Sequence, residues 1–71
     1  MPVKRGQSLE ELAEARFRDA AGAVFRRLRN ERGWSLREFG ERVGVAHTSL
    51  YAVERCETIP GIHTLAAVAH A

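Results

Sequence analysis

The strongest constraint on this chain is a short helix whose two ends are both marked in the sequence. Ser35 and Glu38 have the spacing of a capping box, in which each side chain accepts a hydrogen bond from the other residue's backbone N–H group. Gly44 directly follows Val43, at the position where a left-handed C-terminal cap favours glycine. We therefore expect a short helix over residues 36–43, followed by a tight turn.

A second short helix is predicted directly after this turn, over residues 46–55 and opening near His47. Two short helices joined by a glycine-containing turn of a few residues form the helix-turn-helix unit, here over residues 35–55. Such a unit reads DNA in many proteins, but a helical hairpin without that role would share much of the pattern. The apolar residues expected to fix the angle between the two helices are Phe39, Val43, Val45, Leu50 and Val53.

A longer helix is predicted before this unit, over residues 9–32. Ser8 and Glu11 have the spacing of another capping box, and Gly33 ends the helical pattern. Gly22 costs about 1 kcal/mol relative to alanine in a helix interior, so a break or kink there is the alternative. The residues of its predicted apolar stripe are Leu9, Leu12, Ala13, Phe17, Ala20, Ala21, Val24 and Leu28.

The C-terminal part of the sequence predicts one more helix, over residues 62–71, after a loop closed by Pro60. No stretch has a pattern strong enough to predict a strand. The expected fold class is therefore all-α, with one small helical bundle over residues 8–71 and a flexible basic arm over residues 1–7. The core side of the last helix is predicted to contain Ile62, Leu65, Ala66, Val68 and Ala69.

Composition narrows the class of protein without deciding its function. The 71 residues include 11 Lys and Arg, ten of which are arginine, and the net charge is +2. Arginine forks match the geometry of phosphate, so the composition permits nucleic-acid binding but does not establish it. The single cysteine, Cys56, cannot form an internal disulfide, and we expect a cytoplasmic location. No apolar stretch reaches the length of about 20 residues that spans a membrane.

Nothing in the sequence suggests an enzyme. It contains no nucleophile–base pattern and no phosphate-binding loop, and a chain this short hardly forms a deep pocket. His63 and His70 lie on one face of the last predicted helix, but no cysteine or carboxylate accompanies them at ligand spacing. We expect no catalytic residue, no cofactor and no metal.

The stretch from Val24 to Ala71, about two thirds of the chain, resembles the Cro/C1-type repressor domain of the XRE family of regulators. The matching motifs are Leu28-Arg29, Leu36 to Glu38, Phe39-Gly40, Val43-Gly44-Val45, Val53-Glu54-Arg55, Pro60 and Leu65-Ala66. The resemblance implies a lambda-repressor-like DNA-binding bundle. It also implies a largely buried structural ion pair between Arg29 and Glu54.

The sequence departs from the pattern of this family in four ways. Cys56 stands where glycine is usual, which implies strain of about 1 kcal/mol or more if its φ is positive. Leu36 replaces the glutamine that often contacts a phosphate. Residues 9–20 extend the first helix, and the chain ends within a truncated C-terminal helix. These last two departures would leave apolar surface exposed. It would then be covered by the extended helix, by a partner chain or by the rest of a longer regulator.

The resemblance places the DNA-reading surface on the helix that opens near His47, whose first exposed residues reach base edges in the major groove. The expected base contacts are His47, Thr48 and Ala52. The expected phosphate contacts are Ser35, Arg37, Tyr51, Arg55 and Thr58.

Two functions follow from this interpretation. The first is a sequence-specific transcriptional regulator, a repressor that binds double-stranded DNA as a homodimer and associates with the nucleoid. The alternative is a protein-interaction module, such as an antirepressor or a docking domain, that keeps the fold without reading DNA. Its partner helix would bind the apolar stripe of the long N-terminal helix.

Overall fold

The computed structural model describes residues 8–71, so the predicted basic arm at residues 1–7 lies outside the described residues. Four helices and no strand make up the described part: α1 (Leu9–Glu31), α2 (Leu36–Val43), α3 (His47–Glu54) and α4 (Ile62–Ala69). Each begins and ends within two residues of its prediction, and the all-α fold class is confirmed. No described helix has both the length and the apolar character that crossing a membrane requires.

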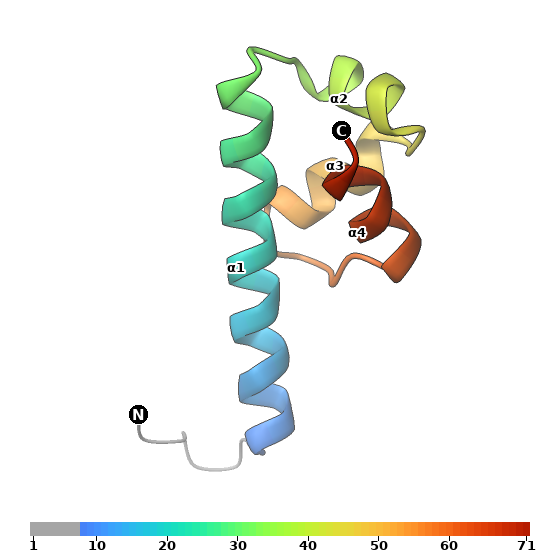
Figure 1. The fold of residues 1–71 in the computed structure, drawn as a ribbon. Helices are drawn as coiled ribbons and strands as arrows, with labels where there is room; N and C mark the ends of the chain where they lie inside the picture. The colour runs from blue at the N-terminus through green and yellow to red at the C-terminus, as the bar shows by residue number, and fades with distance from the viewer. Residues whose placement is uncertain (1–7) are drawn as a thin grey trace.

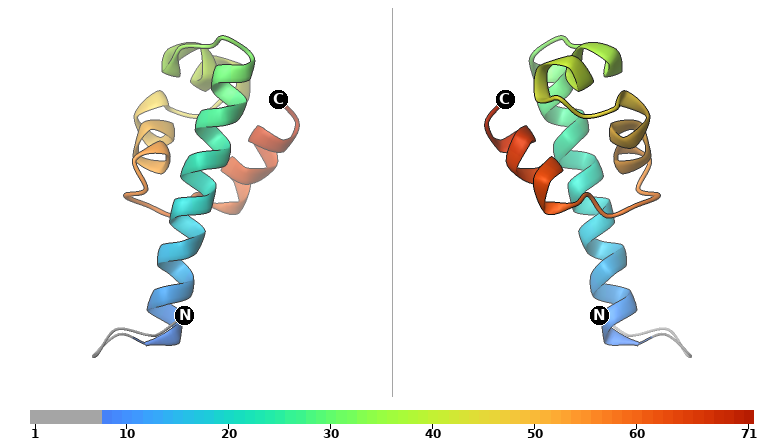
Figure 2. Two further views of the ribbon diagram at one scale, coloured as in Figure 1. Left: turned by 90° about the vertical axis from the view of Figure 1, so that its left-hand side faces the viewer. Right: turned by 90° about the vertical axis from the view of Figure 1, so that its right-hand side faces the viewer.

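The long helix α1 forms the spine of the molecule (Figure 1). The three short helices all lie on one side of its C-terminal half (Figure 1), and α3 and α4 flank α1 when the molecule is viewed along that side (Figure 2). The N-terminal half of α1 projects beyond the bundle, which gives the molecule an elongated shape of 41 × 21 × 19 Å.

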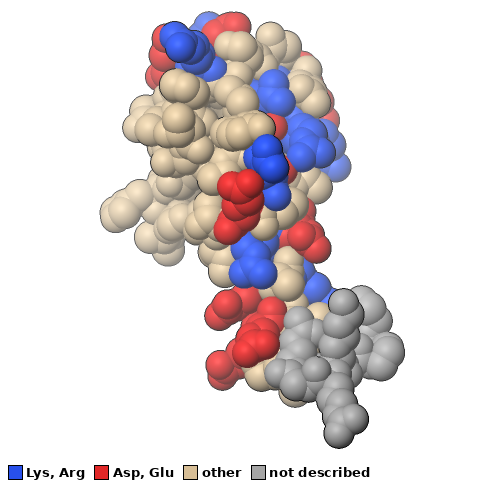
Figure 3. Space-filling view, turned by 180° about the vertical axis from the view of Figure 1, so that it is seen from behind, with Lys and Arg blue, Asp and Glu red and all other residues tan. Residues whose placement is uncertain are grey.

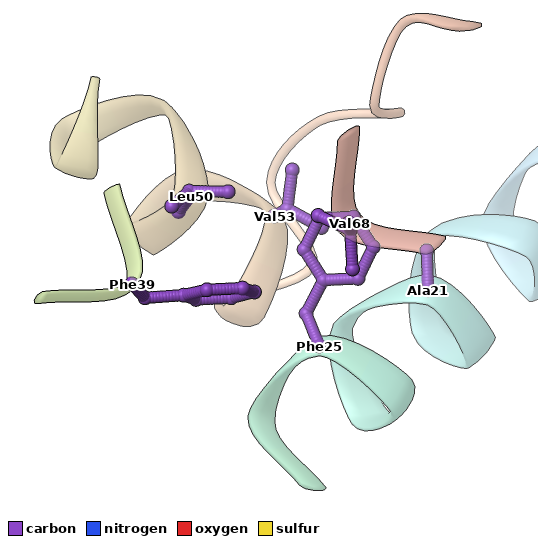
Figure 4. Packing of buried hydrophobic residues seen from close by; sticks show 6 residues of the cluster. All are labelled: Ala21, Phe25, Phe39, Leu50, Val53 and Val68. Carbon is purple, nitrogen blue, oxygen red and sulfur yellow. The ribbon is translucent and has the colours of Figure 1, made fainter. Parts of the chain in front are cut away.

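The hydrophobic core joins all four helices (Figure 4). Its largest fully buried side chains are Phe39 of α2 and Leu50 of α3, and the ring of Phe39 meets Phe25 of α1 edge to face at 6.1 Å. The buried hydrophobic residues are Ala21, Phe25, Phe39, Leu50, Val53 and Val68. The core therefore fixes α2 and α3 against the C-terminal half of α1.

The apolar stripe predicted on α1 lies only in part against the core. Ala21 is buried in the core and Leu28 packs against it, whereas Leu9, Phe17 and Val24 are 73%, 43% and 42% exposed. Phe25, which was not in the stripe, is 2% exposed and supplies the main core contact. Successive residues of a helix are about 100° apart, so α1 has two apolar faces, and Phe25 lies on a different one from Val24.

The close approach of α3 explains why α1 contains a glycine at position 22. The helix is continuous through Gly22, so the predicted alternative of a break there is wrong. A Cβ atom at this position would lie 2.7 Å from the carbonyl oxygen of Val53 and 2.8 Å from Sγ of Cys56. Gly22 is buried, and its missing side chain lets the end of α3 rest directly on α1.

Replacing Gly22 with alanine is expected to destabilise the domain by about 1–3 kcal/mol, because backbone atoms of α3 must move to admit the Cβ atom. Helix propensity alone predicts the opposite sign, a gain of about 1 kcal/mol. The matched control is Ala23→Gly at the neighbouring exposed position, which should lose about 1 kcal/mol through propensity only. Urea unfolding measures both changes. A stabilised Gly22→Ala variant would show that α1 and α3 do not touch here.

Candidate nucleic-acid interface

The helix ends around the α2–α3 turn are held as the sequence predicts. Ser35 Oγ accepts a hydrogen bond from the N–H group of Glu38 at 3.1 Å, and Glu38 Oε1 accepts one from Ser35 at 3.3 Å. Gly44 has a φ of 73°, in the left-handed region. At the start of α1, Ser8 Oγ accepts from the N–H group of Glu11, but the structure shows only this half of the predicted box.

A second glycine sets the start of α3 directly against α2. A Cβ atom on Gly40 would lie 2.6 Å from the carbonyl oxygen of Val45 and 3.1 Å from the backbone nitrogen of His47. The carbonyl oxygen of Gly40 accepts hydrogen bonds from the N–H groups of Gly44, at 2.8 Å, and Val45, at 3.1 Å. The turn is therefore tight, and it fixes where the first residues of α3 emerge.

The two sides of α3 differ sharply in exposure. Leu50 and Val53 are 0% and 2% exposed and face the core. His47, Thr48 and Tyr51 are exposed on the other side, and Ala52 is partly exposed. The residues that we expected to contact bases thus lie on the outer surface of a helix whose inner surface is fully packed.

A bidentate ion pair fixes the C-terminal end of α3 to α1. Arg29 Nε donates to Glu54 Oε2 at 2.8 Å, and a second guanidinium nitrogen donates to Oε1 at 2.9 Å. The Glu54 side chain is 5% exposed and that of Arg29 is 20% exposed. The hydrogen bond to Glu54 raises the pKa of the Arg29 guanidinium, against an opposing effect of burial. The structure therefore brings together the two residues that the resemblance paired.

Arg26, which sequence reasoning missed, strengthens the same junction. It donates to the backbone carbonyl oxygen of Glu54 at 2.7 Å. The only signal in the sequence was its position one turn before Arg29, on the same side of α1. Two arginines of α1 therefore hold the last turn of α3.

Two hollows flank the outer side of α3 and collect most of the predicted contact residues. One, of 400 Å³, lies between α2 and α3 and brings Arg37 close to His47. The other, of 470 Å³, lies between α3 and the start of α4 and brings together Thr48, Ala52 and Thr58. Its lining also includes Ser49 of α3, Ile59 of the loop and Thr64 of α4, none of which was predicted. Thr64 was missed because α4 had been assigned only an apolar core side.

The remaining predicted phosphate contacts have partners within the chain. Arg55 donates to Tyr51 Oη at 2.9 Å, its guanidinium lies over the Tyr51 ring, and it pairs with Glu57 at 2.9 Å. The hydrogen bond to Tyr51 is the main cause that raises the pKa of Arg55, and the nearby carboxylate of Glu57 adds to it, so Arg55 stays charged. Ser35 uses its hydroxyl group as the cap of α2. Among the described residues, no ion pair involves the exposed Arg37.

Residues 20–71, well over half of the chain, match a family model described as a helix-turn-helix domain. The chain belongs to the helix-turn-helix domain family. Neither a comparison with curated proteins nor one with solved structures gives a match. The family match begins at Ala20, inside α1, so the projecting half of this helix precedes the part that defines the helix-turn-helix domain.

The helix-turn-helix domain carries a strained residue directly after α3. Cys56 has a φ of 61°, in the left-handed region where the resemblance expected glycine, and its side chain is partly buried near Gly22. A positive φ at a residue with a side chain stores about 1 kcal/mol or more. The strained turn directs the chain away from α1 and into the loop that carries Thr58.

Charge is unevenly distributed over the helix-turn-helix domain. Figure 3 views it from the side on which α3 lies, and much of this surface is uncharged, with arginines along α1 beside it. Acidic side chains gather instead at the projecting end of α1. His63 is exposed on α4 and His70 is exposed directly after it, and the described residues contain no group of three or more side chains suited to hold a metal ion.

Proposed function

We propose that this chain is a sequence-specific DNA-binding regulator of the Cro/C1 type, a repressor that reads the major groove with α3. His47, Thr48 and Ala52 contact base edges, and Ser35, Arg37, Tyr51, Arg55 and Thr58 contact phosphates. The protein acts as a homodimer on a palindromic operator, in the cytoplasm and on the nucleoid. It works without catalysis or a cofactor.

The single observation that carries this proposal is the two-sided character of α3. The core and the Arg29–Glu54 pair hold its inner side at a fixed angle, while its outer side presents His47 and Thr48 to solvent. An imidazole can donate to guanine, and a threonine can bond a base edge or meet a thymine methyl group. A rigid helix with such groups at its exposed start suits direct readout in the major groove.

The phosphate contacts are supported by their positions on both sides of α3. Arg37 lines the hollow before α3, and Thr58 lines the hollow after it. Arg55 lies at the end of the helix, where its guanidinium retains donors beyond those used for Tyr51 and Glu57. Contacts at these points would set the register of the helix on the duplex without reading its sequence.

One observation favours the alternative function. The projecting half of α1 exposes Phe17 and Leu9, which a protein-interaction module would use to bind a partner helix. The modest net charge of +2 also fits this alternative. In that case the outer side of α3 would have no DNA to read.

A salt titration of the wild-type protein distinguishes the two functions. Binding to a random duplex is measured by fluorescence anisotropy at several salt concentrations. A regulator that neutralises several phosphates should lose affinity with a slope of about −0.9 per contact on a double-logarithmic plot. No detectable binding at low salt would reject DNA reading and favour the interaction module.

A further inference from the structure

The projecting half of α1 needs a partner that the bundle does not supply. Most of the stability of a helix in a protein comes from the packing of its apolar face, and the first buried residue of α1 is Ala21. Residues 9–19 also precede the part of the chain that matches the helix-turn-helix family. Packing of this segment must therefore come from a surface other than the core of its own domain.

One face of α1 has the pattern of a helix-pairing seam. Ala13, Phe17, Ala20 and Val24 follow one another at steps of four, three and four residues, which is the spacing of the two apolar positions of a heptad repeat. All four residues are exposed. At about 100° per residue, this face lies roughly a third of a turn from Phe25, so it can be covered without disturbing the core.

We propose that a second copy of this chain covers this face through antiparallel pairing of the two α1 helices. In the register that we infer, Phe17 of each copy lies opposite Ala20 of the other, and Ala13 lies opposite Val24. Each large side chain then meets a small one, and every contact occurs twice because the interface is two-fold symmetric. This inference deepens the homodimer of the proposed function and assigns a surface to it.

Charge supports the antiparallel direction and the register. The same pairing places Glu10 at one end of the seam opposite Arg27 of the second copy. Both residues are exposed, and Arg27 forms only a long surface pair with Glu31 at 3.8 Å within its own chain. A parallel arrangement would instead set Glu10 against Glu10 and Arg27 against Arg27, with repulsion at both positions. The face is thus complementary to itself in both size and charge, which favours a second copy over an unrelated partner.

Sedimentation equilibrium without DNA tests the pairing. The wild-type chain should self-associate in the micromolar to high micromolar range. Phe17→Glu should lower the association constant about tenfold or more, because it places a charge in the seam on both copies. The matched control is Ile62→Glu on α4, where the wild-type side chain is 77% exposed. This variant should associate as the wild type does, and circular dichroism should show that both variants are folded.

Charge reversal tests the register separately. Glu10→Arg and Arg27→Glu should each weaken association, and the double variant should restore it, because the attraction is rebuilt with its signs exchanged. A wild-type chain that stays monomeric at high micromolar concentration would overturn the inference, as would a Phe17→Glu dimer of undiminished strength. Loss of association in Ile62→Glu alone would overturn it too, by placing the interface on α4. Because no DNA is present, these results stand apart from the salt titration of the proposed function.

Discussion

Arg29→Ala is expected to cost the domain about 3–5 kcal/mol of folding free energy, because the buried Glu54 carboxylate loses both of its hydrogen bonds to Arg29 and keeps only a long pair with the more exposed Arg26 at 3.9 Å. Glu54 is 4% exposed, so water cannot replace the lost hydrogen bonds. The one-fifth exposure of Arg29 places the expected loss towards the lower end of that range. Since small domains have only about 5 kcal/mol or somewhat more in total, this variant should retain roughly 2 kcal/mol of stability and unfold at a much lower urea concentration than the wild type.

The matched control for this prediction is Arg27→Ala. Arg27 lies on the same helix and pairs with Glu31, but both of these side chains are more than half exposed. Such a surface pair contributes about 0–1 kcal/mol. Urea unfolding followed by circular dichroism compares the two variants. Equal losses in both would show that the Arg29–Glu54 pair does not hold α3 in place.

The second large effect concerns selectivity. His47→Ala and Thr48→Ala should each cost about 1–3 kcal/mol on the cognate site and little on random DNA, because they remove contacts to bases. Arg37→Ala and Arg55→Ala should weaken binding to both kinds of DNA alike. Each should also lower the salt slope by about one unit, because one phosphate contact is lost.

Titration of each variant against a selected site and a random duplex measures these differences. The control is Arg16→Ala, which removes an exposed positive charge from the projecting half of α1, six residues or about 9 Å along the helix before Gly22, where α1 meets the end of α3. It should leave both affinities nearly unchanged, since exposed charges separated by more than about 10 Å are largely screened at ordinary salt. If all four contact variants bind as the wild type does, α3 is not the reading surface.

Local signals predicted the helices well because each acts over a few residues. Ser35 with Glu38, and Gly44 after Val43, mark the ends of α2, and the structure shows the capping contacts that these spacings imply. Gly33 likewise ends the pattern of α1 and adopts a φ of 67°. Such signals depend on backbone geometry next to the residue and need no knowledge of the rest of the fold.

The face of α1 that packs against the core could not be predicted from such local signals. The helix contains two apolar faces, one with Phe17 and Val24 and the other with Phe25, and periodicity does not say which one meets the core. The role of Gly22 was missed for a related reason. The missing side chain allows a close contact with α3, which is distant in the sequence. The Arg29–Glu54 pair was expected only from family resemblance, since no spacing rule connects two residues so far apart.

The candidate site was predictable as a set of exposed residues but not as an arrangement. The pattern of α3 indicated that His47 and Thr48 lie outside, and they do. It did not indicate that Arg37 shares a hollow with His47, or that Arg55 is held by Tyr51 and Glu57. These groupings depend on the tight turn at Gly40 and on where the loop after α3 returns.

Methylation interference tests most directly the claim that α3 reads the major groove. Methyl groups on guanine N7 project into the major groove, and those on adenine N3 project into the minor groove. We expect guanine N7 methylation within the selected site to block binding, and this effect should fade in the His47→Ala variant. Interference from adenine N3 methylation alone would contradict major-groove reading by α3, because the protein would then be reading the opposite groove.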